Sequence, residues 1–263
     1  MGKRIKLQIA YDGTNYCGWQ VQKNGLSIQQ VLEEALHKVT GEKIRVAGAS
    51  RTDAGVHALG NVAVFDTEAR MPGDKYSYAL NTYLPDDISC VGSMEVSPQF
   101  HPRFTSTVKT YTYDILNRRF PDPTRRLYSY LCWRELDLER MREALPYLVG
   151  EHDFASFQAS GTSAVKETTV RTIYKAHLTE TDDMIRLTIQ GNGFLYHMVR
   201  IIAGTLIDIG KGFLQPEDMQ RIIEAKSRPQ AGPTAPACGL TLAEIRYPEW
   251  EPDFLEKKDS SEV

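Results

Sequence analysis

The sequence lacks three features that would place it in a specialised class: a long apolar run, an excess of basic residues and paired cysteines. No apolar segment approaches the roughly 20 residues of a membrane-spanning helix, and the N-terminus lacks the apolar block of a signal peptide. The formal net charge of −3 gives no general attraction to nucleic acid, so any such surface has to be local. The four cysteines, Cys17, Cys90, Cys132 and Cys238, are scattered, which is typical of a reduced cytosol. We therefore expect a cytoplasmic protein that has no membrane contact.

The chain is long enough for one large or two small globular domains. It has 263 residues, of which 41% are hydrophobic and 25% are charged. Its first part predicts, in order, a strand over 5–11, a helix over 27–39, strands over 43–47 and 61–65, a helix over 72–83 and a strand over 88–96. That order is the split βαβ arrangement of ferredoxin-like domains, in which an open sheet has helices on one face, and RNA-recognition modules share it.

The second part repeats this pattern of strands and helices without visible sequence repetition. Residues 98–103 interrupt the pattern, so we predict an N-terminal lobe over 1–103, a C-terminal lobe over 104–250 and a charged tail over 251–263. The second lobe is predicted to contain strands over 107–116, 170–178, 184–190 and 240–247, helices over 136–148, 194–209 and 216–226, and a loop over 151–169. The predicted fold class is α+β, with two RNA-recognition-like (ferredoxin-like) lobes, a mixed and mainly antiparallel sheet, helices on one face and a cleft between the lobes.

The stretch GASRTDAGVHA, residues 48–58, is a polar loop between two predicted strands. Asp53 is its only carboxylate, and Arg51 is near enough in sequence to hold that carboxylate ionised. The glycines would let the backbone approach a ligand closely. From these residues alone, a functional loop and a solvated turn are equally good interpretations.

Arg200 lies in GFLYHMVRIIAG, within the most apolar predicted helix. A buried arginine is costly without a carboxylate partner, and no acidic residue lies one turn away. Asp53 is a candidate partner, which would place the two halves of the chain across one cleft; alternatively, Arg200 extends to solvent at the edge of the apolar face. His197 could be a base, but a lone helical histidine is more often structural. Tyr111, in the middle of the strand KTYTYDI, is by its pattern a packing residue.

Two loops offer side chains that RNA could use. Residues 117–126, NRRFPDPTRR, cannot form regular structure because they contain two prolines. Against the single acid Asp122, the segment carries four arginines, Arg118, Arg119, Arg125 and Arg126. Because arginine suits phosphate geometry, we favour phosphate contact over a solvated loop. Tyr16 and Trp19 either cap the core, which is the default, or offer stacking surfaces to bases.

Five motifs follow one another along the chain. They are YDGTNYCGWQ at 11–20, GASRTDAGVHA at 48–58, KTYTYDI around Tyr111, GNGFLYHMVRIIAG from Gly191 and APACGLTL from Ala235. With these motifs the sequence resembles the bacterial tRNA pseudouridine synthase A family nearly from end to end. Each motif alone would be a weak signal, and five in order make a chance similarity implausible.

The resemblance implies a role for each matching residue. The family's catalytic aspartate falls on Asp53, the arginine two before it on Arg51, the active-site tyrosine on Tyr111, and the helical arginine that pairs with the aspartate on Arg200. Leu240 corresponds to the apolar residue that lines the base pocket. The resemblance also implies a homodimer of two-lobed subunits with no metal or organic cofactor. The implied substrate is the anticodon stem-loop of tRNA, at nucleotides 38, 39 and 40.

The implied reaction, isomerisation of uridine to pseudouridine, suits a single carboxylate. It moves the bond between sugar and base from nitrogen to carbon, and Asp53 would serve as nucleophile toward sugar or base, or as base. A hydrolytic glycosidase ordinarily uses two carboxylates. Because the uracil must leave the base stack, Tyr111 and Leu240 would provide an aromatic face and an apolar wall. Arg51 would fill the vacated space, and Arg200 would keep Asp53 charged.

Three other interpretations stay open at the level of sequence. A non-catalytic RNA-binding protein would explain the aromatic residues and arginines, but not an aspartate in a glycine-lined loop. A nucleoside or nucleic-acid glycosylase would use a similar pocket and release free uracil. A purely structural protein would need none of these residues.

Overall fold

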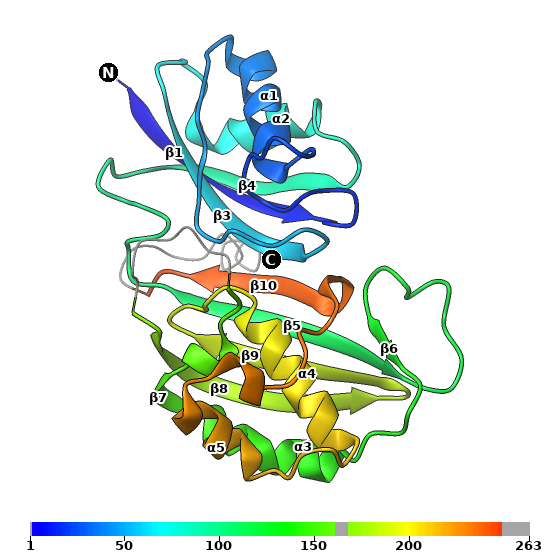
Figure 1. Ribbon diagram of the computed structural model, residues 1–263. Coiled ribbons are helices and arrows are strands. Elements are labelled where there is room, and N and C mark those ends of the chain that lie inside the picture. Colours follow the sequence, from blue (N-terminus) through cyan, green and yellow to red (C-terminus); the bar gives the residue numbers. More distant parts are fainter. Residues whose placement is uncertain (1, 161–167, 249–263) are drawn as a thin grey trace, which may run out of the picture. The chain divides into compact units, whose positions relative to one another are not determined.

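A computed structural model describes residues 2–160 and 168–248 (Figure 1). These residues divide into two compact units. Unit 1 contains residues 2–108 and 242–248, and unit 2 contains residues 109–160 and 168–241. The tail predicted over 251–263 lies outside the described residues.

The sheet of unit 1 is built on β1 (Lys3–Tyr11) and is antiparallel. β4 (Ile88–Val96) and β3 (His57–Thr67) pair with its two edges, which gives the strand order β4-β1-β3. A two-residue strand, β2 (Ala47–Gly48), pairs with β3. The alternating residues of β1 are fully buried, as the sequence predicts, and this fixes which face of the strand meets the core.

Two α-helices lie on one side of this sheet (Figure 1). α1 (Ile28–Thr40) begins where the hydroxyl of Ser27 accepts a hydrogen bond from the N–H of Gln30 at 3.2 Å. It ends at Gly41, whose φ of 75° places it in the left-handed region. Both ends were therefore predictable from the sequence. The second helix is α2 (Tyr76–Asn81), which follows the 3-10 turn η1 (Gly73–Lys75).

The strand predicted over 43–47 is wrong except at Ala47. The preceding residues carry no regular structure, because the N–H of Val46 donates to the carboxylate of Glu33 on α1 at 3.1 Å. The alternation of side chains in this segment is real, but its hydrogen bonds go to a helix side chain. The strand predicted over 61–65 is longer than expected, since β3 begins at His57, inside the predicted loop.

The sheet of unit 2 has the strand order β5-β9-β8-β7. Its antiparallel members are β5 (Val108–Asn117), β9 (Met184–Gly191), β8 (Val170–Thr181) and β7 (Gly150–Asp153). A short strand, β6 (Tyr130–Cys132), pairs in parallel with β5 and makes the sheet mixed. The last strand, β10 (Leu240–Arg246), passes from unit 2 into unit 1.

Three α-helices lie together on one side of the sheet of unit 2 (Figure 1). They are α3 (Leu138–Ala144), α4 (Met198–Gly210) and α5 (Asp218–Ala225). Nearly every residue of α4 is buried, as its composition predicts. Short 3-10 turns connect these elements: η2 (Leu145–Leu148), η3 (Ala155–Phe157), η4 (Arg228–Gln230) and η5 (Ala237–Gly239).

Several predicted bounds in unit 2 are wrong. The helix predicted over 194–209 begins only at Met198, because His197 has a φ of 61° and cannot belong to a right-handed helix. The helix predicted over 136–148 is α3 followed by η2, which contains Pro146. The loop predicted over 151–169 includes most of β7 and all of η3, and β6 was not predicted.

The predicted class, α+β with a mixed and mainly antiparallel sheet, is confirmed, and the described residues form five α-helices. Within residues 2–160 and 168–248, no helix is both long enough and apolar enough to cross a membrane.

Candidate active site

The predicted site residues are divided between the two units. Unit 1 contains Arg51 and Asp53 in the segment between β2 and β3, residues 49–56, which we call the aspartate loop. Unit 2 contains Tyr111 on β5, Arg200 in α4 and Leu240 at the start of β10. Arg51 is exposed, whereas Asp53 is half-buried.

The aspartate loop is held by the end of β1 and the segment that follows it. The backbone N–H of Trp19 donates to the carbonyl of Thr52 at 3.0 Å, and the hydroxyls of Thr52 and Tyr11 lie 2.7 Å apart. Within the loop, the N–H of Val56 donates to the carbonyl of Asp53 at 3.2 Å and closes a turn on the aspartate. Thr52, the residue before Asp53, is therefore fixed by contacts from outside the loop.

Two glycines make this close packing possible. Gly18 has a φ of 101°, and a Cβ there would lie 2.6 Å from the carbonyl oxygen of Thr52. A Cβ on Gly13 would lie 2.0 Å from the carbonyl oxygen of Val56. A side chain at either position would displace the backbone beside Asp53. The glycines of the motif at 11–20 thus serve to position the aspartate loop.

The side-chain amide of Asn61 ties the aspartate loop to β3. Its Nδ2 donates to the carbonyl of Ser50 at 3.0 Å and to the hydroxyl of Tyr11 at 3.2 Å, and its Oδ1 accepts from the N–H of Ser50 at 3.3 Å. Asn61 is fully buried, so these bonds satisfy groups that water cannot reach. Sequence reasoning missed this residue, although an asparagine that opens the apolar run NVAVF is a visible signal.

Tyr16 and Trp19 belong to the core of unit 1. Only 6% of Tyr16 and 2% of Trp19 is exposed, so the default interpretation is confirmed and base stacking by these rings is wrong. The Trp19 ring fills the space over Gly48, where a Cβ would lie 2.3 Å from it. The Tyr16 hydroxyl donates to Asp87 at 2.5 Å, and burial together with this bond raises the pKa of Tyr16.

Tyr111 is anchored in the sheet of unit 2. It lies opposite Ile189 of β9, and its ring meets that of Phe194 edge to face, with the centroids 5.2 Å apart. With 8% of its surface exposed, the side chain is largely fixed by packing. Tyr113, two residues on, is buried on the same face of β5, as the alternation predicts.

Arg200 lies in the first turn of α4 and is half-buried. Its Nε donates to the carbonyl of Ala235 at 2.8 Å, and the N–H of Ala235 donates to the carbonyl of Arg200 at 3.1 Å. These reciprocal bonds fix both the backbone and the guanidinium of Arg200 to the segment that precedes β10. Leu240, which ends this segment, has 6% of its surface exposed. Within unit 2, Arg200 is thus in direct contact with the segment that leads to Leu240.

His197 is the residue immediately before α4, not a residue inside it. Its left-handed backbone is uncommon for residues other than glycine, although histidine is among the few types enriched there. Its ring stacks on that of Tyr196, with centroids 3.8 Å apart and planes inclined by 28°. The carbonyl of Tyr196 in turn accepts a hydrogen bond from the N–H of Ala159 at 3.1 Å. The left-handed turn at His197 therefore sets where α4 begins, two residues before Arg200.

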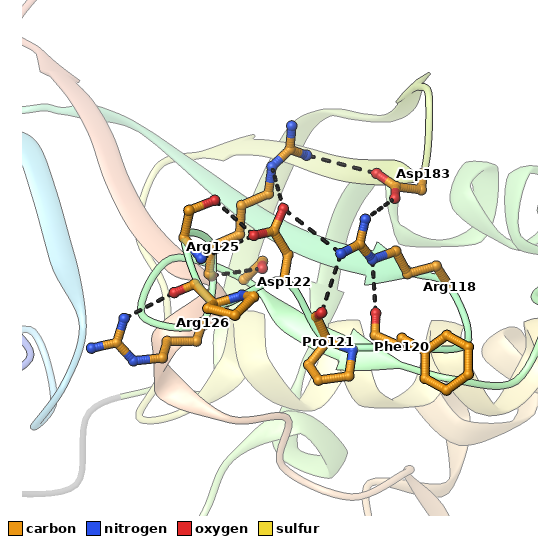
Figure 2. Close-up of polar contacts among 10 residues, drawn as sticks. Arg118, Phe120, Pro121, Asp122, Arg125, Arg126 and Asp183 are labelled. Carbon is orange, nitrogen blue, oxygen red and sulfur yellow. Dashed lines mark hydrogen bonds and ion pairs between the residues drawn. The ribbon is translucent and has the colours of Figure 1, made fainter.

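The arginine-rich loop between β5 and β6 is divided by its ion pairs (Figure 2). Arg118 donates to Asp183 at 3.0 Å and to the carbonyls of Phe120 and Pro121 at 2.7 and 3.2 Å. Arg125 lies 3.7 Å from Asp122 and 3.8 Å from Asp183. These two arginines therefore fold the loop and neutralise the two aspartates. The sequence did not reveal Asp183, which comes from the turn between β8 and β9.

The charge that remains on this loop belongs to Arg119 and Arg126. Both are exposed. Arg126 donates to the carbonyl of Pro123 at 2.9 Å, and within the described residues Arg119 has no hydrogen bond or ion pair, its guanidinium lying 5.5 Å from the centroid of the exposed Phe120 ring. Hydrogen bonds from Thr124 lower the pKa of Asp122, as do the nearby arginine charges, so Asp122 is ionised at neutral pH. Among the four arginines predicted to contact phosphate, Arg118 and Arg125 are therefore in ion pairs with described residues, and Arg119 and Arg126 are not.

The chain is similar to known proteins over most of its length. A family model described as tRNA pseudouridine synthase matches residues 8–105 and 144–248. The chain is 47% identical over 245 residues to "tRNA pseudouridine synthase A" of Thermoanaerobacter sp. (strain X514), covering 93% of this chain and 100% of the relative. It is 49% identical, with the same coverage, to the protein of that name from Acetivibrio thermocellus. A solved structure entitled "Crystal Structure of a Cbf5-Nop10-Gar1 Complex" aligns with 91% of this chain and 56% of that one, at a TM-score of 0.30 and 10% identity, values too low to support an inference.

Replacing Asn61 by alanine should destabilise unit 1. The substitution leaves the Ser50 backbone groups and the Tyr11 hydroxyl without the buried amide that satisfies them. We expect the free energy of unfolding, measured by urea titration, to fall by about 2–4 kcal/mol. Asn15, which is exposed on the segment after β1, provides the control, and Asn15→Ala should change the value by less than about 0.5 kcal/mol. Equal effects of the two substitutions would contradict the role given to Asn61.

Proposed function

The chain belongs to the tRNA pseudouridine synthase A family, isomerases that convert uridine to pseudouridine, and on this premise we propose that Asp53 is the catalytic carboxylate. The observation that carries the proposal is the construction of the aspartate loop. Hydrogen bonds from Tyr11, Trp19 and Asn61 hold the residues around Asp53, and the carboxylate is the one acidic group of the loop.

The reaction explains why one carboxylate is enough. The bond from C1′ of the sugar to N1 of uracil breaks, a bond from C1′ to C5 forms, and the proton on C5 is lost while N1 gains one. No atom leaves and nothing is oxidised, so neither a second carboxylate to activate water nor a redox group is needed. Asp53 acts as nucleophile toward sugar or base, or as the base that removes a sugar proton.

Unit 2 provides the remaining groups of the proposed site. Tyr111 gives an aromatic face and a hydroxyl, Leu240 gives an apolar wall for the uracil, and Arg200 keeps the carboxylate of Asp53 charged. The proposal is supported by the contacts that hold two of these residues in place. Tyr111 is held by β9 and Phe194, and Arg200 is held by Ala235. Arg51, exposed on the aspartate loop, fills the space that the extruded uridine leaves in the RNA.

The remaining features of the proposal come from the family resemblance. The substrate is the anticodon stem-loop of tRNA, at nucleotides 38, 39 and 40, and the target uridine flips out of the stack. The two lobes are RNA-recognition-like, with the site in the cleft between them, and the enzyme works as a cytoplasmic homodimer without a metal or organic cofactor. The division of the chain into two compact units, each with helices on one side of its sheet, supports the two-lobed arrangement.

Phosphate contact is assigned to Arg119 and Arg126. All four arginines of the loop were candidates, but the donors of Arg118 and Arg125 are directed at Asp122, Asp183 and backbone carbonyls. A guanidinium already paired with carboxylates is attracted less strongly to a phosphate than one without such partners. The neutralised pair instead holds the loop in the shape that exposes the other two.

Incubation with a tRNA transcript tests the proposed reaction. We expect the wild-type protein to form pseudouridine and no free uracil, and Asp53→Asn to lower the single-turnover rate by at least about a thousandfold, because the amide is neither a nucleophile nor a base. Asp74→Asn is the control, since Asp74 is an exposed residue of unit 1 paired only with the exposed Lys75 among the described residues. Free uracil would indicate a glycosylase, and neither product would indicate an RNA-binding or structural protein. Appreciable turnover by Asp53→Asn would remove Asp53 from the chemistry.

Replacing Arg119 and Arg126 together by glutamine should weaken tRNA binding. Two fewer phosphate contacts release fewer counterions, so the slope of log K against log salt should become shallower by about 1.5. The matched control is Arg142→Gln with Arg221→Gln, a half-buried and an exposed arginine of unit 2 that each pair with an acidic neighbour on their own helix. An unchanged slope in the Arg119 and Arg126 variant would show that the phosphates are held elsewhere on the protein.

A further inference from the structure

Residues 232–240 lead to Leu240 and accept the hydrogen bond from Arg200 at Ala235; we call this segment the strap, and it is held near both ends. At its beginning the N–H of Gly232 donates to the hydroxyl of Thr205 on α4 at 3.0 Å. A Cβ on Gly204, one residue earlier in α4, would lie 1.9 Å from the carbonyl oxygen of Pro233. The helix and the strap therefore meet at the closest distance that glycine permits.

The far end of the strap rests on Tyr113. The Tyr113 hydroxyl donates to the carbonyl of Pro236 at 2.9 Å, and a Cβ on Gly239 would lie 2.8 Å from the Tyr113 ring. Tyr113 is fully buried, and burial raises its pKa, so the hydroxyl stays protonated and remains a donor. One side chain thus holds two points of the strap, Pro236 just before η5 and Gly239 at its last residue.

Pro236 directly follows Ala235, whose carbonyl accepts the hydrogen bond from Nε of Arg200. The carbonyl of Ala235 is held by Arg200, and the next carbonyl along the chain, that of Pro236, is held by Tyr113. Without the Tyr113 hydroxyl, the part-buried hydrogen bond to the Pro236 carbonyl would be lost, and this part of the strap would be free to move. Any such movement would also shift the oxygen that orients the guanidinium.

We propose that Tyr113 is a positioning residue for Arg200, which it serves through the strap. The inference rests on the proposed function, because Arg200 is assigned to the active site there. Tyr113 itself does not touch the substrate: its hydroxyl is used by Pro236 and its ring is covered by Gly239. Strand β5 therefore has two tasks, presenting Tyr111 directly and fixing Arg200 indirectly from two residues further along.

Tyr113→Phe tests this role, and Tyr247→Phe is a closely matched control. Tyr247 is also buried, its hydroxyl also donates to a proline carbonyl, that of Pro102, at 2.9 Å, and its ring packs on Phe100. Each substitution deletes one hydrogen bond of equal length from a tyrosine hydroxyl to a proline carbonyl, which is part-buried for Tyr113 and buried for Tyr247. A purely structural contribution would therefore affect both variants alike.

We expect Tyr113→Phe to lower kcat by about ten- to a hundredfold, because a misplaced guanidinium no longer supports the reacting groups, while KM changes by less than about twofold. Tyr247→Phe should keep both constants. In an Arg200→Lys background, which lacks the Nε donor to Ala235, adding Tyr113→Phe should cost less than about twofold more. Equal kcat losses in the two phenylalanine variants, no loss in either, or the same Tyr113→Phe penalty in the Arg200→Lys background would each overturn the proposal.

A second measurement does not depend on activity. Hydrogen exchange of the Arg200 Nε–H, followed by NMR, should be at least about tenfold faster in Tyr113→Phe than in the wild type, because the bond to Ala235 is weakened. Tyr247→Phe should leave it unchanged. If the wild-type protein formed no pseudouridine, the proposed function would fail while this comparison would still decide the role of Tyr113. Unchanged exchange in Tyr113→Phe would contradict it.

Discussion

The buried amide of Asn61 is the interaction on which the aspartate loop depends. A loop has no hydrogen-bonding pattern of its own, so its backbone groups need partners from outside. Asn61 satisfies both polar groups of Ser50 and reaches the Tyr11 hydroxyl, which in turn meets Thr52. A charged side chain can be presented at a fixed place only if the chain on either side of it cannot move. The amide gives this rigidity to residues that lack regular structure.

The same physical solution recurs in unit 2. Arg200 is bound to the strap by two reciprocal hydrogen bonds with Ala235, and the strap is bound to Tyr113 on the sheet. In each unit, a polar side chain on a rigid strand holds an irregular segment that bears or orients a site residue. This arrangement combines the precision of the sheet with the accessibility of a loop. It also explains why the motifs contain small residues: glycines at 18, 204 and 239 permit the contacts that larger residues would prevent.

The sequence predicted what depends on local pattern. Alternation along β1 and β5 gave their buried faces, and Ser27 and Gly41 gave the two ends of α1. Prediction failed where a distant partner decides the structure. The alternating segment before Ala47 is not a strand because Glu33 of α1 takes its hydrogen bond. The ion pairs of the basic loop were likewise not predicted, because Asp183, which pairs with Arg118 and Arg125, lies more than 50 residues away in sequence.

For the candidate site, the sequence indicated the candidate residues themselves but not the residues that hold them in place. Motif resemblance made Asp53, Tyr111, Arg200 and Leu240 the candidate residues, because they lie inside motifs that can be read directly in the sequence. The residues that hold them could not be found so easily. Asn61 and Tyr113 look like ordinary members of strands, and only the hydrogen bonds of the folded chain reveal what they support. The left-handed backbone of His197 is likewise invisible in a sequence that reads as continuous helix.

The central claim is that Asp53 acts on a uridine held by groups of both units. A crystal structure of the Asp53→Asn variant bound to an anticodon stem-loop RNA tests it most directly. The account predicts a target uridine turned out of the stack, its uracil between the Tyr111 ring and Leu240, and its C1′ facing the side chain at position 53. A target uridine that stays stacked in the RNA, or that is bound on another surface of the protein, would contradict it.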